Sequence, residues 1–97
     1  MVIRALDVVP DCYSWENGNT ISKTIGALFQ TGQTAIISFD DVTDVPSSFV
    51  NAAFISLLDE YTFEFIKSHL KLINCSSQII DMVQRRFEFE TRSLKAS

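Results

Sequence analysis

The stretch TAIISF at residues 34–39 is a short, mainly apolar run. Runs of this kind are typical of β-strands that are covered on both faces, as in parallel sheets. Residues 40–46 are polar and predict a loop, and residues 47–61 then carry apolar side chains at helical spacing. The centre of the chain therefore predicts a strand, a loop and a helix in succession.

Strands and helices are also predicted on both sides of this centre. Residues 2–9 are β-branched and partly alternating, residues 69–74 alternate as well, and both segments predict strands. Helical spacing predicts a helix from residue 20 that Gly32 ends, and a final helix over residues 76–87. The order β-α-β-α-β-α implies an α/β fold with a small, mainly parallel sheet and helices packed on it.

Polar side chains mark the expected helix starts. Residues 11–19 are predicted to form a polar loop, at the end of which Asn19 or Thr20 caps the first helix. Ser47 or Asp44 is the predicted cap of the second helix.

A chain of 97 residues predicts one domain, and 46% hydrophobic content is enough for its core. We expect this domain to span residues 1–90, followed by a polar, frayed tail at residues 91–97. Phe63 and Phe65, spaced by two before the third strand, fit either loop anchors or a short extra strand.

The composition argues against several classes of protein. No apolar run approaches the roughly 20 residues of a membrane span, and residues 1–4 lack a signal-peptide pattern. Cys12 and Cys75 lack metal-ligand spacing, and we expect reduced thiols in a cytoplasmic protein. The basic residues do not form an aromatic-interleaved motif, so we expect no nucleic-acid binding.

Charge is distributed unevenly along the chain. Residues 1–66 carry nine acids and two bases, whereas residues 67–97 carry six bases and three acids. This asymmetry is either a solvated surface or a field that orients a partner.

Catalytic constellations are not apparent. His69 is the single histidine and lacks a plausible triad, and no glycine-rich phosphate loop or Cys/His zinc set is present. Asp40-Asp41, with Asp11 and Lys71, suggests a magnesium site of phosphoreceiver type as an alternative to a solvated acidic loop. We expect no catalysis, no cofactor and no bound metal.

The second helix contains the most informative polar residues, Ser47 and Ser48. A serine at this position either caps the helix or is phosphorylated, which would place a dianion at the helix terminus. Phe49, Ala52 and Ile55 fall on the face that the helical wheel predicts to be outward. Together these five residues predict a protein-contact surface, and Met82 with Phe89 form a weaker second candidate.

Residues 36–49 and 65–76 resemble a short STAS-like family related to the bacterial anti-sigma-factor antagonists, and the resemblance covers about residues 20–88. In those antagonists a serine in an Asp-Ser-Ser-Gly motif is phosphorylated by a kinase with an ATPase fold, which breaks their complex. The resemblance places Ser47 at the phosphoserine position, with Pro46 and Phe49 in place of the aspartate and glycine.

The resemblance implies a non-enzymatic bacterial regulatory module that binds an ATPase/kinase-type or other regulatory protein. Two alternatives remain: a phosphorylatable switch at Ser47, and a small phage-type inhibitor that blocks a host machine. A homodimer is also compatible with the sequence.

Overall fold

A computed structural model describes residues 2–95 of the chain. Within this range, three parallel strands form one sheet in the order β1-β2-β3, with bounds Val2–Arg4, Ala35–Ser38 and Leu70–Ile73. Ile37 of β2 lies between Ile3 of β1 and Leu72 of β3. The predicted α/β class, the parallel sheet and the strands at 34–39 and 69–74 are thus confirmed.

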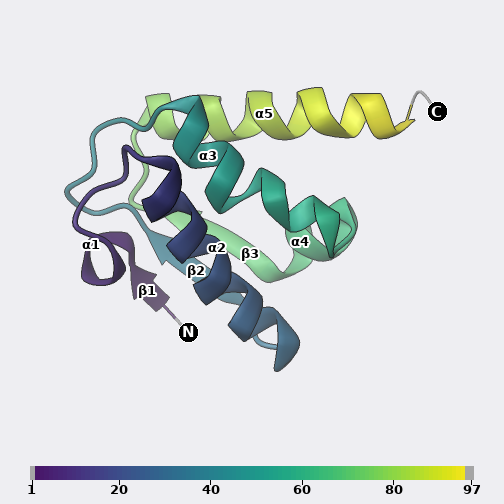
Figure 1. Cartoon of the computed structure of the whole chain (residues 1–97), viewed down its shortest axis with the longest axis horizontal. Helices are drawn as coiled ribbons and strands as arrows, with labels where there is room; N and C mark the ends of the chain where they lie inside the picture. The colour runs from purple at the N-terminus through teal and green to yellow at the C-terminus, as the bar shows by residue number, and fades with distance from the viewer. Residues whose placement is uncertain (1, 96–97) are drawn as a thin grey trace.

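Helices connect and follow these strands. In chain order they are α1 (Ala5–Val8), α2 (Trp15–Gln30), α3 (Ser47–Ala53), the 3₁₀ helix η1 (Ile55–Asp59), α4 (Phe63–His69) and α5 (Ser77–Lys95). Figure 1 shows α2 in front of the sheet with α3 beside it, and α5 crossing the end of the molecule near the N-termini of α2 and α3. Right-handed crossovers between strands in sequential order place their helices on one face, which agrees with this arrangement.

The predicted first strand over residues 2–9 is wrong in its second half. After Arg4 the chain forms α1, and the N–H of Val9 donates to the carbonyl of Ala5 at 3.0 Å. Ala5 and Val9 are both buried because residues four apart share one side of a helical turn. A short apolar run cannot distinguish this turn from a strand.

Helix α2 begins earlier than predicted, so residues 15–19 belong to a helix and not to a loop. Ser14 is its N-cap, and the Ser14 hydroxyl accepts a hydrogen bond from the N–H of Asn17 at 3.1 Å. Neither Asn19 nor Thr20 is the cap. Gly32, at φ +76, follows the helix end as predicted, because glycine adopts the left-handed conformation without strain.

The second predicted helix is shorter and is buried on more sides than its helical wheel suggests. Helix α3 ends at Ala53 and continues as η1, and its N-cap is Pro46 without a side-chain hydrogen bond, so neither Ser47 nor Asp44 caps it. Phe49 is 0% exposed and Ala52 is 5% exposed, while Ile55 is half-buried against the core. The prediction that these three apolar side chains face outward is therefore wrong. Phe49 packs against Phe39 in the core, Ala52 packs against Gly18 of α2, and Ile55 packs against the core from η1.

The remaining corrections lie in the last third of the chain. Phe63 and Phe65 belong to α4, not to a loop or strand, and His69 ends this helix. Helix α5 extends beyond Phe87 to Lys95, so the expected frayed tail is helical through residue 95. Residues 96 and 97 of that tail lie outside the described residues.

Candidate protein-contact site

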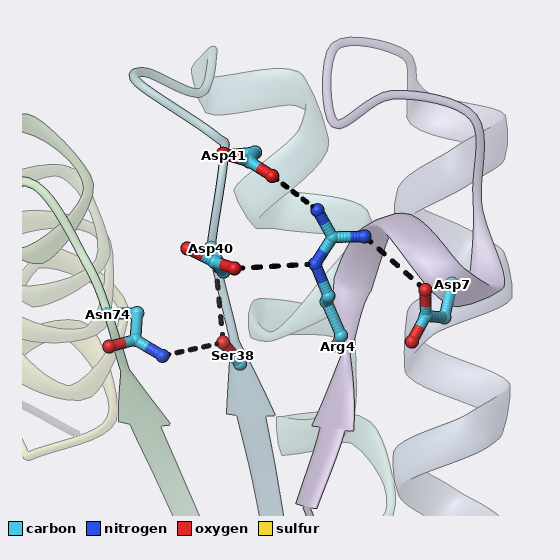
Figure 2. A network of polar contacts seen from close by, with 6 residues as sticks. All are labelled: Arg4, Asp7, Ser38, Asp40, Asp41 and Asn74. Atoms are coloured by element: carbon cyan, nitrogen blue, oxygen red, sulfur yellow. Dashed lines mark hydrogen bonds and ion pairs between the residues drawn. The ribbon is translucent and has the colours of Figure 1, made fainter.

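The carboxyl ends of the three parallel strands lie at one end of the sheet. There Arg4, at the end of β1, contacts the residues that follow β2. Its guanidinium group lies 3.3 Å from Asp7 and 3.6 Å from Asp40, and donates a hydrogen bond to Asp41 (Figure 2). The hydrogen bond to Asp41, followed by that to Asp7, raises the pKa of Arg4. Arg4 therefore neutralises part of the negative charge that the paired aspartates place at this end of the sheet.

This arrangement does not assemble the alternative magnesium site. Asp40 and Asp41 contact Arg4, whereas Asp11 accepts hydrogen bonds from Tyr13 and Asn17, and Lys71 is exposed within β3. Among the described residues, no group of three or more His, Cys, Asp or Glu side chains is placed to hold a metal ion.

Ser38 and Asn74 connect the ends of β2 and β3. The Ser38 hydroxyl accepts hydrogen bonds from the side-chain amide of Asn74 at 2.9 Å and from the N–H of Asp40 at 3.3 Å (Figure 2). Asn74 and Asp41 both have positive φ, at 55° and 66°, which lets the chain turn sharply as it leaves the strands. The three strand ends thus form one hydrogen-bonded and ion-paired framework.

The loop over residues 40–46 is clamped to the start of α5. Gln78 uses both ends of its side-chain amide on Val45: its oxygen accepts from the Val45 N–H and its nitrogen donates to the Val45 carbonyl, each at 3.0 Å. The Ser76 hydroxyl donates to the carbonyl of Thr43 at 2.7 Å. Since Val42 and Val45 are also buried, the backbone that leads into α3 is held from both sides.

Two aromatic side chains are exposed beside this loop. Tyr13 is 54% exposed and Trp15 is 60% exposed, although large aromatic residues usually lie in cores or contact surfaces. The Tyr13 hydroxyl donates to the Asp44 carboxylate at 3.4 Å. This contact joins the start of α2 to the loop that precedes α3, and Figure 1 shows the two helix starts side by side.

Ser47 and Ser48 are exposed in the first turn of α3. Gly18, in the first turns of α2, packs against Phe49 and Ala52 and so brings the two helix starts together. We call Tyr13, Trp15, Asp44, Ser47 and Ser48 the α2–α3 surface. It contains the two predicted serines but not Phe49, Ala52 or Ile55.

Tyr13 and Trp15 are not among the residues that the sequence predicted for this site. The signal that could have found them is the presence of two large aromatic residues in a segment read as a polar loop. The contact between Tyr13 and Asp44 could not be predicted from such a local signal, because the two residues are 31 positions apart in the chain.

The reactive side chains elsewhere are held in structural positions. The Nδ1 atom of His69 lies 3.0 Å from the carbonyl oxygen of Phe65, and the two rings stack with centroids 4.1 Å apart. Cys12 and Cys75 are free thiols, and burial raises the pKa of both, to about 11 for Cys12. A buried thiol with a raised pKa is a poor nucleophile at neutral pH. Within residues 2–95, no helix has the length and apolar character needed to cross a membrane.

Comparison with known proteins adds one finding. A family model described as "STAS-like domain of unknown function (DUF4325)" matches residues 17–79, which is more than half of the chain. The match runs from α2 into the first turn of α5, and it includes Ser47 and Ser48 but not Tyr13 or Trp15. No curated protein and no solved structure matches the chain.

Proposed function

The chain belongs to this STAS-like family, and on that premise we propose that it is a bacterial regulatory protein that binds another protein through the α2–α3 surface without catalysing a reaction. The observation that carries the proposal is the exposure of Tyr13, Trp15, Ser47 and Ser48 at two helix starts that pack together next to a clamped loop. Tyrosine and tryptophan are the residue types most enriched among side chains that dominate binding energy.

The rigid framework supports this proposal energetically. Association costs free energy when loops and side chains must be ordered, and preorganised backbone reduces that cost. Here Gln78 and Ser76 hold the loop over residues 40–46 before any partner arrives. A partner would therefore meet a surface whose backbone already has its bound conformation.

The charge of the surface favours a partner with a basic contact region. Asp44 lies on the surface, exposed Glu16 follows Trp15, and Asp11 is close by through its hydrogen bond to Tyr13. Opposite charges across an interface accelerate association and select among partners. An ATPase/kinase-type regulator is the partner class that the family resemblance favours.

A double variant tests this surface. Tyr13→Ser combined with Trp15→Ser should leave the fold intact because both side chains are largely exposed, and should weaken capture of the partner by about thirtyfold or more. The measurement is affinity capture from the native host, with the partner identified by mass spectrometry and its binding then titrated with purified proteins.

The matched control is Phe89→Ser, which removes an equally exposed aromatic ring from α5. It should retain the partner at full affinity. Retention of the partner by the Tyr13/Trp15 variant, or its loss from the Phe89 variant, would place the contact elsewhere.

A phosphorylatable switch at Ser47 is a second candidate, favoured by the exposure of Ser47 in the first turn of α3. Phosphate there would add a dianion close to Asp44, which would strengthen the attraction to a basic contact region and oppose an apolar one. Intact-mass analysis of the protein from its host, with Ser47→Ala for comparison, tests this candidate. A phosphate that persists in the Ser47→Ala variant would exclude Ser47 as its site.

A further inference from the structure

Strand β3 forms one outer edge of the sheet, and part of its backbone points away from β2. The carbonyl of Ile73 accepts a hydrogen bond from the N–H of Phe39, so the backbone groups of Ile73 face β2. Successive residues of a strand direct their backbone groups to opposite sides. The carbonyl of Leu70 and both backbone groups of Leu72 therefore face the free edge, while the N–H of Leu70 donates to Ile66 at the end of α4.

An apolar groove runs beside this edge. It has a volume of about 670 Å³ and lies between α4, β3 and α5. Ile66 and Val83 form buried parts of its wall, and Leu70 and Leu72 line it with half-buried side chains. The residues that offer free backbone groups thus also offer apolar side chains, which is the combination that an added strand requires.

Positive charge flanks the groove on its strand side. Lys67 lines the groove from α4, with its ammonium group 5.4 Å from the centre of the Phe63 ring. Lys71 is exposed on β3 between the two leucines, and its side chain points to the opposite face of the sheet from the groove. Glu88 lines the groove from α5. An occupant that lies along β3 therefore meets two lysines, and acidic side chains complement them.

The same lysine disfavours a second copy of this chain as the occupant. A two-fold pairing of two β3 strands that aligns Leu70 with the second copy's Leu72 sets the two copies of Lys71 directly opposite each other. Like charges in that position destabilise a strand pair, and lysine on an edge strand is a common means of preventing self-association.

We propose that an extended segment of a partner protein adds to the sheet alongside β3. Its backbone bonds to Leu70 and Leu72 and its alternate apolar side chains enter the groove beside Lys67. An acidic side chain between them points to the other face of the sheet and contacts Lys71. This site is separate from the α2–α3 surface and does not rest on the function proposed for that surface.

Selection of peptides tests the proposal. A display library of random short peptides is panned against the immobilised full chain, and the tightest peptide is titrated into isotope-labelled protein by NMR. The selected peptides should share apolar residues at alternate positions with an acidic residue between them. Amide shifts should concentrate in α4, β3 and the middle of α5.

Charge reversal provides the specific control. The double variant Lys71→Glu with Lys67→Glu should lower the affinity for the acidic peptide by up to about fivefold per lysine. It should raise the affinity for the same peptide when lysine replaces its acidic residue. Tyr13→Ser with Trp15→Ser should leave peptide affinity unchanged, which separates this site from the α2–α3 surface.

Two results of the selection would overturn the proposal: no peptide selected above background, or selected peptides whose apolar residues do not alternate. Amide shifts centred on α2 and α3 would also overturn it, as would equal peptide affinity of the parent protein and the charge-reversed variant. Sedimentation equilibrium gives the remaining outcome: a dimer that Lys71→Glu alters would assign the β3 edge to a second copy of the chain.

Discussion

A β-carbon at Gly18 would lie 2.6 Å from the backbone carbonyl oxygen of Phe49 and 2.9 Å from the Cβ atom of Ala52. Helices α2 and α3 therefore approach each other at a distance that only glycine permits. This close approach buries Ala52 against α2, and it brings the start of α2 against the start of α3.

Gly18→Ala should destabilise the domain by about 1–3 kcal/mol, because the added methyl group forces the two helices apart. Gly26→Ala is the matched control in the same helix, since an added β-carbon there meets nothing within 4 Å. It should stabilise the domain by about 0.5–1 kcal/mol through helix propensity. Urea unfolding measures both, and equal effects would contradict the close approach.

Phe49→Ala should cost about 3–5 kcal/mol of the free energy of unfolding, because Phe49 is fully buried beside Phe39 with ring centroids 6.4 Å apart. Phe89→Ala, at a 60% exposed position, should cost less than about 1 kcal/mol. A Phe49→Ala variant as stable as the Phe89→Ala variant in chemical denaturation would restore Phe49 as a candidate surface anchor.

Ser14→Ala should lower the free energy of unfolding by about 1 kcal/mol, because the Ser14 hydroxyl caps α2 by accepting a hydrogen bond from the Asn17 N–H. Ser47→Ala should change stability by less than about 0.5 kcal/mol, since Pro46 precedes α3 as a cap without a side-chain hydrogen bond. Thermal melts followed by circular dichroism compare the two, and the reverse order would show that Ser47 is the stabilising serine.

Gln78→Ala should lower the free energy of unfolding by about 1–2 kcal/mol, because two hydrogen bonds to the backbone of Val45 are lost together. The loosened loop should also accelerate hydrogen exchange at the amide of Val45. Gln84→Ala, on an exposed position of the same helix, should leave both quantities unchanged. Unaltered exchange at Val45 in the Gln78 variant would mean that the loop is held by other contacts.

Cys12 should resist alkylation in the folded protein, because desolvation, with a smaller contribution from Asp11, raises its pKa from 9.0 to about 11. Cys75, which is only half-buried, should react first. The contribution of the neutral Cys12 thiol to the free energy of unfolding is fully present below pH 9. It is lost as the pH rises toward about 11. Iodoacetamide labelling followed by mass spectrometry checks the order, and a flatter alkaline stability profile for Cys12→Ala checks the sign.

The predictions of helices and strands were correct where a single local sequence pattern is sufficient to define the backbone conformation. The strand within residues 34–39 and the strand within residues 69–74 lie where hydrophobic patterning placed them, and Gly32 follows the end of α2. Parallel pairing followed from the alternation of strands and helices, because crossover connections join parallel strands. These features depend on periodicity and chain geometry, both of which can be read from neighbouring residues.

The candidate site was predictable only in part. The exposure of Ser47 and Ser48 agrees with their predicted place at a helix start, whereas Phe49 and Ala52 were assigned to the wrong side of α3. A helical wheel assumes one buried face, but α3 packs against the core on one side and against α2 on another.

By itself, then, the sequence determined the fold class, the two longer strands and the membership of Ser47 and Ser48 in an exposed helix start. Only the tertiary structure decided which aromatic side chains remain exposed and what holds the neighbouring loop. The contacts responsible join residues far apart in the chain: Arg4 to Asp41 across 37 positions and Gln78 to Val45 across 33. Such pairs leave no local periodicity, since their partners become neighbours only after the sheet and helices have packed.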